Sequence, residues 1–198
     1  MIKYIICIVL IVLWLYILNV LKRAELHFWR FIAGSFGLFI FLMILARPVL
    51  TQPLAKAVAS ISGLFGNLTD TFSAYFKYGI LFIESAAGAI TLQVDFECSG
   101  IIEIMAFISL LAFFMVYTVN ERIVIGVLGT IYIILANVLR VTVICLIIHF
   151  FGPDAYFISH TIIGRLIFYT FSVMLYFYVF TKPQIIRMKI GKFTYGHS

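Results

Sequence analysis

Charged residues are scarce in this chain. They make up 11% of its 198 residues, whereas hydrophobic residues make up 64% and the mean hydropathy is +1.16. A soluble globular domain has about 25% charged and about 45–50% apolar residues. With so few polar groups the chain cannot cover its surface in water, so its solvent must be lipid. The sequence therefore predicts an integral membrane protein, and the length leaves no room for a separate soluble domain.

Cysteines are also few, and they form no scaffold pattern. Cys7, Cys98 and Cys145 contain no CxxC pair and no framework spacing, which argues against a disulfide scaffold and a zinc ribbon. Cys7 and Cys145 lie in the middle of apolar runs and are interpreted as packing residues. The chain has no internal repeat, coiled coil or low-complexity tract. Its net charge of +6 does not indicate nucleic acid, because the basic residues flank apolar runs and are better explained as topology signals facing anionic lipid.

Five apolar runs approach or exceed the 20 or so residues that a membrane-spanning helix needs. They are residues 2–21, 27–46, 99–119, 123–150 and 161–180. The first is too long for a signal peptide and no A-x-A site follows it, so we expect it to be retained as a span. The expected fold is an all-α integral membrane protein of about five transmembrane helices, with residues 1–198 in a single membrane domain.

Basic residues predict the orientation. They gather around the first connection, in the turn between the third and fourth runs, and in the tail 181–198: Lys22, Arg23, Arg30, Arg122, Lys182, Arg187, Lys189 and Lys192. Five spans put these three places on one face, which the positive-inside rule makes cytoplasmic. We therefore expect a multi-pass protein of the cytoplasmic membrane whose basic tail contacts anionic lipid. The segment 47–98 and the loop 151–160 are then outside, although Arg47, Lys56 and Lys77 weaken this orientation.

The outer segment 47–98 shows two periodicities. Apolar residues from Leu54 to Tyr75 recur in steps of four and three, which indicates an amphipathic helix lying at the interface. Apolar and polar residues then alternate over 90–97, which indicates a strand. Its partner is expected around Leu81 and Ile83, across a turn at 86–88. The result is a short β-hairpin before the third core helix, and it must lie in the headgroup zone or against protein because sheet edges cannot face lipid.

Cys98 lies where the strand pattern stops and the third span begins. With Ser99 as the N-cap, the thiol faces the positive end of the helix dipole, which lowers its pKa and favours thiolate. The negative charges of Glu97 and Asp95 act in the opposite direction and raise the pKa of the thiol. A single cysteine in such a place is most often an inert buried residue, so Cys98 alone does not establish a nucleophile.

Arg140 lies inside the fourth span, about 15 Å below its outer end. Snorkelling alone does not easily cover that depth. Arg140 is either a structural residue satisfied by carbonyl groups or Glu103, or a cation that lines a polar cavity; the high cost of burial favours the cavity. Arg165, in the fifth span, is either a partner of Glu103 or a second cation of the same site.

His160 opens the fifth span on the outer side, with Gly164 one turn further on; His149 is a weaker candidate for the same role. Under the five-span topology Cys98, Arg140 and His160 share one layer. Their chemistry suits acyl transfer, in which a thiolate attacks a carbonyl, an imidazole moves protons and a guanidinium stabilises the oxyanion. No metal or organic cofactor is expected.

Three motifs carry a family resemblance: Cys98-Ser99-Gly100-Ile101 after an alternating strand, Asn137-x-x-Arg140 in the next span, and His160-x-x-x-Gly164 in the last. In this order, over about residues 88–170, the set resembles the exosortase/archaeosortase family, and the short chain resembles its compact Gram-positive branch. Many exosortases are longer, with around eight spans, and archaeosortases have an arginine where this chain has a histidine.

The resemblance implies a membrane-embedded cysteine transpeptidase. Its partner would be an exported protein with a C-terminal sorting tail, made of a short motif, a transmembrane helix and a basic cluster. The acyl group would pass to a lipid or cell-envelope acceptor, with the active site facing outside. The resemblance makes Cys98 the nucleophile, Arg140 the essential arginine and His160 the third member. The residues expected to bind substrate or support these three are Ser99, Gly100, Glu103, Asn137, Gly164 and Arg165.

Two other classes of function stay open at this point. In a transporter or small channel, Arg140, Arg165 and Glu103 would line a polar path, but the chain has no inverted repeat and few pore charges. In a non-catalytic assembly subunit, the same polar groups would hold the bundle and a partner together. A metal site of Cys98 and His160 would have too few ligands.

Overall fold

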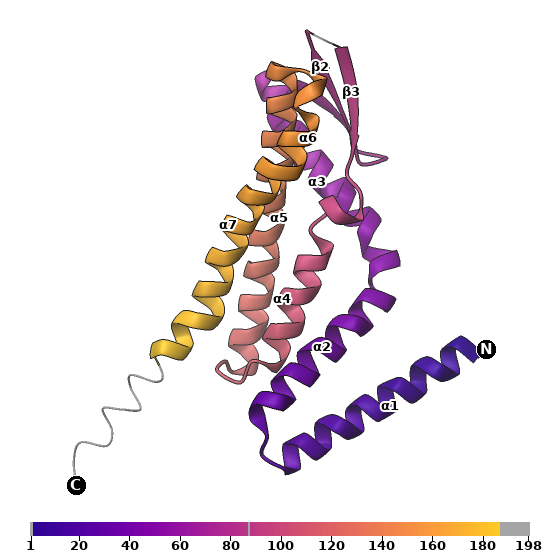
Figure 1. Ribbon diagram of the computed structural model, residues 1–198, viewed down its shortest axis with the longest axis vertical. Coiled ribbons are helices and arrows are strands. Elements are labelled where there is room, and N and C mark those ends of the chain that lie inside the picture. Colours follow the sequence, from indigo (N-terminus) through magenta and orange to yellow (C-terminus); the bar gives the residue numbers. More distant parts are fainter. Residues whose placement is uncertain (1, 87, 187–198) are drawn as a thin grey trace.

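The computed structural model describes the backbone of residues 2–86 and 88–186, and the side chains of residues 9–86, 88–96 and 98–186. The Cys7 side chain and the tail residues Arg187, Lys189 and Lys192 lie outside this described part. Helices dominate the described chain, and one small sheet lies at one end of the molecule (Figure 1).

The elements follow in a simple order. Three helices come first, α1 (Ile2–Arg23), α2 (His27–Leu45) and α3 (Arg47–Thr69). The strands β1 (Phe72–Tyr75), β2 (Ile80–Ser85) and β3 (Gly88–Gln93) lead to a short 3-10 turn, η1 (Phe96–Cys98). The helices α4 (Ile101–Phe113) and α5 (Val119–Phe151) follow. The last helical run is made of η2 (Pro153–Ala155), α6 (Tyr156–Ile158), the π-helical turn η3 (Ser159–Ile163), α7 (Gly164–Tyr176) and the π-helical turn η4 (Phe177–Thr181).

Three described stretches are helical, long and apolar enough to cross a membrane, namely 27–45, 119–151 and 153–186. They support an all-α membrane protein. The helix α4 is apolar but has only 13 residues, about 20 Å of helix, so it is shorter than the predicted third span 99–119. The total of five spans remains a prediction.

A turn held by Arg122 shortens α4. The guanidinium of Arg122 donates hydrogen bonds to the carbonyl oxygens of Ala112 (2.9 Å), Phe114 (3.0 Å) and Tyr117 (3.3 Å), which satisfies the end of α4. A capping box between Thr118 and Glu121 then starts α5. The sequence interpretation treated Arg122 only as a topology signal and missed this structural role.

The predicted loop 151–160 is mostly helical. Only Gly152, at φ 84°, separates α5 from the last helical run. Pro153 follows as the first helical residue, where its fixed φ favours a helix start and its missing N–H costs nothing. The helical run therefore begins eight residues before the predicted start of the fifth span, and His160 lies within it rather than at its end.

The sheet has one strand more than predicted. The helix predicted to reach Tyr75 ends at Thr69, because Asp70 adopts a left-handed conformation (φ 49°), and Phe72–Tyr75 forms β1, antiparallel to β2. Gly66 permits this reversal, since a Cβ there would lie 2.2 Å from the carbonyl oxygen of Phe72. The predicted hairpin of β2 and β3 is confirmed, with Ser85 paired to Gly88. The second strand ends at Gln93 instead of running to residue 97, because Phe96–Cys98 forms the 3-10 turn η1.

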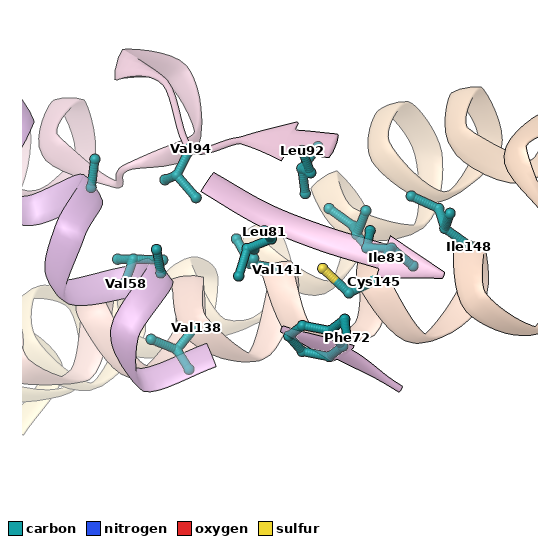
Figure 2. Close-up of a cluster of buried hydrophobic side chains, with 13 residues drawn as sticks. Val58, Phe72, Leu81, Ile83, Leu92, Val94, Val138, Val141, Cys145 and Ile148 are labelled. Carbon is teal, nitrogen blue, oxygen red and sulfur yellow. The ribbon is translucent and has the colours of Figure 1, made fainter. Parts of the chain in front are cut away.

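The sheet packs against one half of α5 through a buried apolar cluster (Figure 2). Its members come from α3, the three strands, the residue that follows β3 by one position, and α5: Ala55, Val58, Ala59, Phe72, Leu81, Ile83, Leu92, Val94, Val138, Val141, Ile144, Cys145 and Ile148. Cys145 is fully buried among them, as its interpretation as a packing residue requires. The hairpin thus lies against protein, and the chain that leaves β3 is fixed beside α5.

Basic residues gather at one end of the molecule. The α1–α2 connection, the α4–α5 connection and the end of η4 lie together at the end opposite the sheet (Figure 1). Lys22, Arg122 and Lys182 belong to or adjoin these segments. We refer to this as the basic end, and to the other as the sheet end.

Candidate active site

Cys98 is the last residue of η1 and lies three residues before α4. Ser99 is not the N-cap that the sequence predicted: its hydroxyl donates to the carbonyl oxygen of Phe96 (2.9 Å), which closes the η1 turn. Gly100 precedes α4 instead, with φ 77°, a left-handed conformation that favours glycine. The glycine turns the chain from η1 into α4 and leaves Cys98 on the side of α5.

Asn137 of α5 holds the backbone of Cys98. Its amide Nδ2 donates to the carbonyl oxygen of Cys98 at 2.5 Å, and the side chain is fully buried. A Cβ on Gly100 would reach ordinary contact distance from this amide, 3.5 Å from Nδ2. The motif residues Gly100 and Asn137 therefore meet each other, and together they fix the Cys98 loop on α5.

The structure brings together the three residues that the sequence predicted as catalytic. Cys98 Sγ lies 3.1 Å from His160 Nε2, although the two residues are 62 positions apart in the chain. Arg140 Nη2 lies 4.0 Å from the same sulfur. Cys98 is half-buried, whereas Arg140 is only 6% exposed. A thiol, an imidazole and a guanidinium thus converge on one point from η1, η3 and α5.

Local structure orients His160. The residue lies in the π-helical turn η3, a geometry that is often found at functional sites. The ring of Tyr156, one turn earlier, stacks on the imidazole with centroids 5.4 Å apart and planes 17° apart. Gly164 brings this helix close to α5, since a Cβ there would lie 2.7 Å from Ile144 Cδ1. Tyr156 and Gly164 together set the direction in which the imidazole points.

A cavity of about 330 Å³ is lined by two of the three residues, Arg140 and His160. Its lining comes from η1, α4, α5 and the last helical run: Phe96, Ile102, Glu103, Arg140, His160, Arg165, Phe168 and Tyr169. The guanidinium carbon of Arg140 lies 5.8 Å from the centre of the Phe168 ring, and its buried Nε has no hydrogen-bond partner among the residues that the structure describes. Arg140 therefore lines a polar cavity, the second of the two alternatives drawn from the sequence, and Glu103 and Arg165 line the same one.

The sequence also singled out His149 and Glu97. His149 lies elsewhere, where its Nδ1 hydrogen-bonds the carbonyl oxygen of Glu84 in β2, so it does not share the place of His160. The side chain of Glu97 lies outside the described residues. Among the residues that the structure describes, no group of three or more His, Cys, Asp or Glu side chains is arranged to hold a metal ion.

Sequence reasoning missed several residues of the site. Tyr156 stands four positions before His160, a helical spacing, but its segment was predicted to be a loop. Phe96 and Phe168 read as ordinary apolar residues of a strand and a span. Arg47, at the start of α3, lies with its guanidinium carbon 3.9 Å from the centre of the Phe96 ring, a contact that no sequence pattern signals.

Comparison with known proteins identifies the family of the chain. A family model described as transmembrane exosortase matches residues 2–177, which include Cys98, Arg140 and His160. No curated protein and no solved structure matches the chain. Since the match runs from α1 to the first residue of η4 and covers most of the chain, the protein belongs to the transmembrane exosortase family.

Proposed function

We propose that this protein is a membrane-embedded cysteine transpeptidase or peptidase that processes the C-terminal sorting tails of exported proteins. Family membership supports a membrane enzyme that acts on sorting signals. The observation that carries the proposal is the distance of 3.1 Å between Cys98 Sγ and His160 Nε2, with Arg140 Nη2 4.0 Å from the same sulfur.

The acylation step follows from this geometry. His160 Nε2 takes the thiol proton of Cys98, and the thiolate attacks the carbonyl carbon of the scissile peptide. The resulting oxyanion develops close to the sulfur, where Arg140 Nη2 donates to it. His160 then gives its proton to the leaving amine as the C–N bond breaks. The products are a thioester on Cys98 and the released tail.

Deacylation reverses the proton path. The acceptor is an envelope or lipid component with an amine or hydroxyl group, or water in the hydrolytic case. His160 removes its proton as it attacks the thioester carbon, and the C–S bond breaks. Cys98 leaves as a thiolate and recovers the proton from His160. Every proton and bond is accounted for without a cofactor.

Two helices give the same depth for the site. The hydrocarbon core of a bilayer takes about 20 helical residues. If the hydrocarbon core starts at Arg122, at the basic end, its far limit lies at about residue 142 of α5. If the core starts at Lys182 and runs back along the last helical run, its far limit lies at about residue 162. Arg140 lies about two residues inside the first limit and His160 about two residues outside the second, so the site lies across the edge of the hydrocarbon, and Arg140 is shallower than the depth of about 15 Å implied by the predicted span 123–150. If the positive-inside rule applies to the basic end, this is the outer edge.

The proposal is tested in the host cell. The cutting of an epitope-tagged exported protein, which has a C-terminal membrane helix followed by a basic cluster, is measured in cells with and without this chain. We expect the exported protein to accumulate uncut in the deletion strain and to be cut again when the gene is restored. A chain-bound adduct that hydroxylamine releases would identify the thioester. Unchanged cutting of every such exported protein in the deletion strain would contradict the proposal.

Arg140→Lys is expected to reduce tail processing by about 10²-fold while the protein stays in the membrane. Lysine keeps the charge but cannot reproduce the planar guanidinium that reaches the sulfur from a buried position. The measurement is the processing rate per inserted protein, with Arg30→Lys on α2 as the matched control. Normal processing by Arg140→Lys would favour the assembly-subunit alternative, which tolerates conservative changes.

Gly164→Ala is expected to slow processing by about 10- to 100-fold. The new Cβ would lie 2.7 Å from Cδ1 of Ile144 and 3.1 Å from the carbonyl oxygen of Ser159, so either the Ile144 side chain or the helix that carries His160 must shift. Ile144 is packed in the buried cluster, so we expect the helix to move and to carry His160 with it. Gly126→Ala is the control, because its Cβ meets only Leu111 at 3.5 Å. Equal rates for the two variants would show that this helix contact does not position His160.

A further inference from the structure

The active-site cavity opens sideways from the bundle. Ile102 and Glu103 of α4 line one side of this cavity, and Arg165 and Tyr169 of α7 line the other. We call the gap between these two pairs of residues the mouth. Arg165 is exposed and Tyr169 is 59% exposed, yet both belong to the stretch 153–186 that is long enough to span a membrane. Side chains exposed on a spanning helix face lipid. The mouth between α4 and α7 therefore faces lipid.

Aromatic side chains close the same face nearer the basic end. The ring of Phe107 on α4 lies 6.2 Å from that of Tyr176 and 6.0 Å from that of Phe180, and Phe114 lies 5.1 Å from Phe180, all between ring centroids. The mouth is thus confined to the part of the bundle beside Arg140 and His160, at the edge of the hydrocarbon. A membrane helix that emerges from the bilayer there would have its outer end level with Cys98.

The mouth also suits an extended polypeptide. Backbone N–H and C=O groups at this depth need hydrogen-bond partners, because water is scarce. Glu103 offers an acceptor and Arg165 a donor, and the buried Nε of Arg140, which has no partner in the described part of the chain, offers a second donor. By contrast, the grooves between α2 and α4 and between α4 and α5 present almost only apolar surface.

We propose that the opening between α4 and α7 is the lateral entrance for the substrate. The substrate's own membrane helix lies in lipid beside Tyr169, and the extended chain at its outer end passes between Glu103 and Arg165 to reach Cys98. This inference rests on the proposed function and adds to it the path of a membrane-anchored polypeptide.

Photo-crosslinking tests the path. A benzoyl-phenylalanine is placed at Tyr169 in the Cys98→Ala chain, which retains uncut substrate. The probe is a tagged exported protein whose processing by the intact chain has already been shown, so the function is established independently. Control positions are Ile131 in the α4–α5 groove (49% exposed) and Phe36 in the α2–α4 groove (65% exposed). We expect crosslinks from Tyr169 to the outer end of the substrate helix and few from the controls. Equal or stronger crosslinks from a control, or none from Tyr169, would overturn the entrance and leave the function standing.

Arg165→Ala gives a second readout. We expect processing to fall about tenfold or more, because a charged hydrogen-bond partner of the substrate is lost. Labelling of Cys98 by a small thiol reagent should keep its rate, since the reagent reaches the sulfur without a docked chain. Lys56→Ala, which removes an exposed cation of α3, is the charge-matched control. Unchanged processing, or an equal fall in labelling and processing, would overturn the assignment.

Discussion

Cys98→Ala is expected to abolish tail processing, with a loss of at least about 10³-fold, while the protein remains inserted. His160 and Arg140 both approach the sulfur of Cys98, and removing a covalent nucleophile leaves only the small contribution of the other groups. The measurement is the fraction of tagged exported protein that is cut at steady state, normalised to the inserted chain.

The matched control for this variant is Cys145→Ala. Cys145 is the other cysteine with a described side chain, it is fully buried, and it packs in the cluster between the sheet and α5 (Figure 2). We expect Cys145→Ala to process tails normally. Normal processing by Cys98→Ala combined with a defect in Arg140 variants would favour the transporter alternative, which needs the arginine and not the thiol.

His160→Gln is expected to reduce processing by about 10²- to 10⁴-fold, the usual contribution of a general acid–base group. Glutamine can still hydrogen-bond the thiol, but it cannot take a proton from Cys98 and return it to the leaving amine. The pH profile of processing separates this role from a structural one. The intact chain should lose activity as pH falls, because the imidazole becomes protonated in the resting state; we call this fall the acidic limb of the pH profile. The residual activity of His160→Gln should not show the acidic limb.

The control for His160→Gln is the same substitution at His149, which hydrogen-bonds the carbonyl oxygen of Glu84 away from the thiol. We expect His149→Gln to keep the acidic limb and most of the activity. If both variants showed the same loss, the imidazole of His160 would have no special part in proton transfer.

Much of this site could be predicted from sequence because membrane topology constrains position strongly. Apolar runs predicted the helices α1, α2, α5 and the last helical run, and chain order then placed Cys98, Arg140 and His160 near one level. The polar–apolar alternation of the β3 region revealed a strand, since a period of two is distinct from a helical one. The buried arginine was informative because such a residue is expensive in a span.

The remaining differences have local causes. The strand β1 has only four residues, and its apolar side chains continue the helical period of α3, so the left-handed turn at Asp70 was not visible. The helix start at Pro153 was obscured by Gly152, which reads as a loop. The short length of α4 depends on three carbonyl groups that Arg122 satisfies across the turn. Each depends on tertiary hydrogen bonds or single dihedral angles rather than on composition.

The most direct test of the account is labelling of Cys98 in intact cells with a membrane-impermeant thiol reagent over a range of pH. Cys7 and Cys145 are first changed to Ala, so that Cys98 is the remaining thiol. We predict labelling from outside with an apparent pKa of Cys98 below the free-thiol value of about 8.5, and a higher apparent pKa in His160→Gln. Absence of labelling at every pH, in a chain shown to be inserted, would contradict an outward-facing, activated nucleophile.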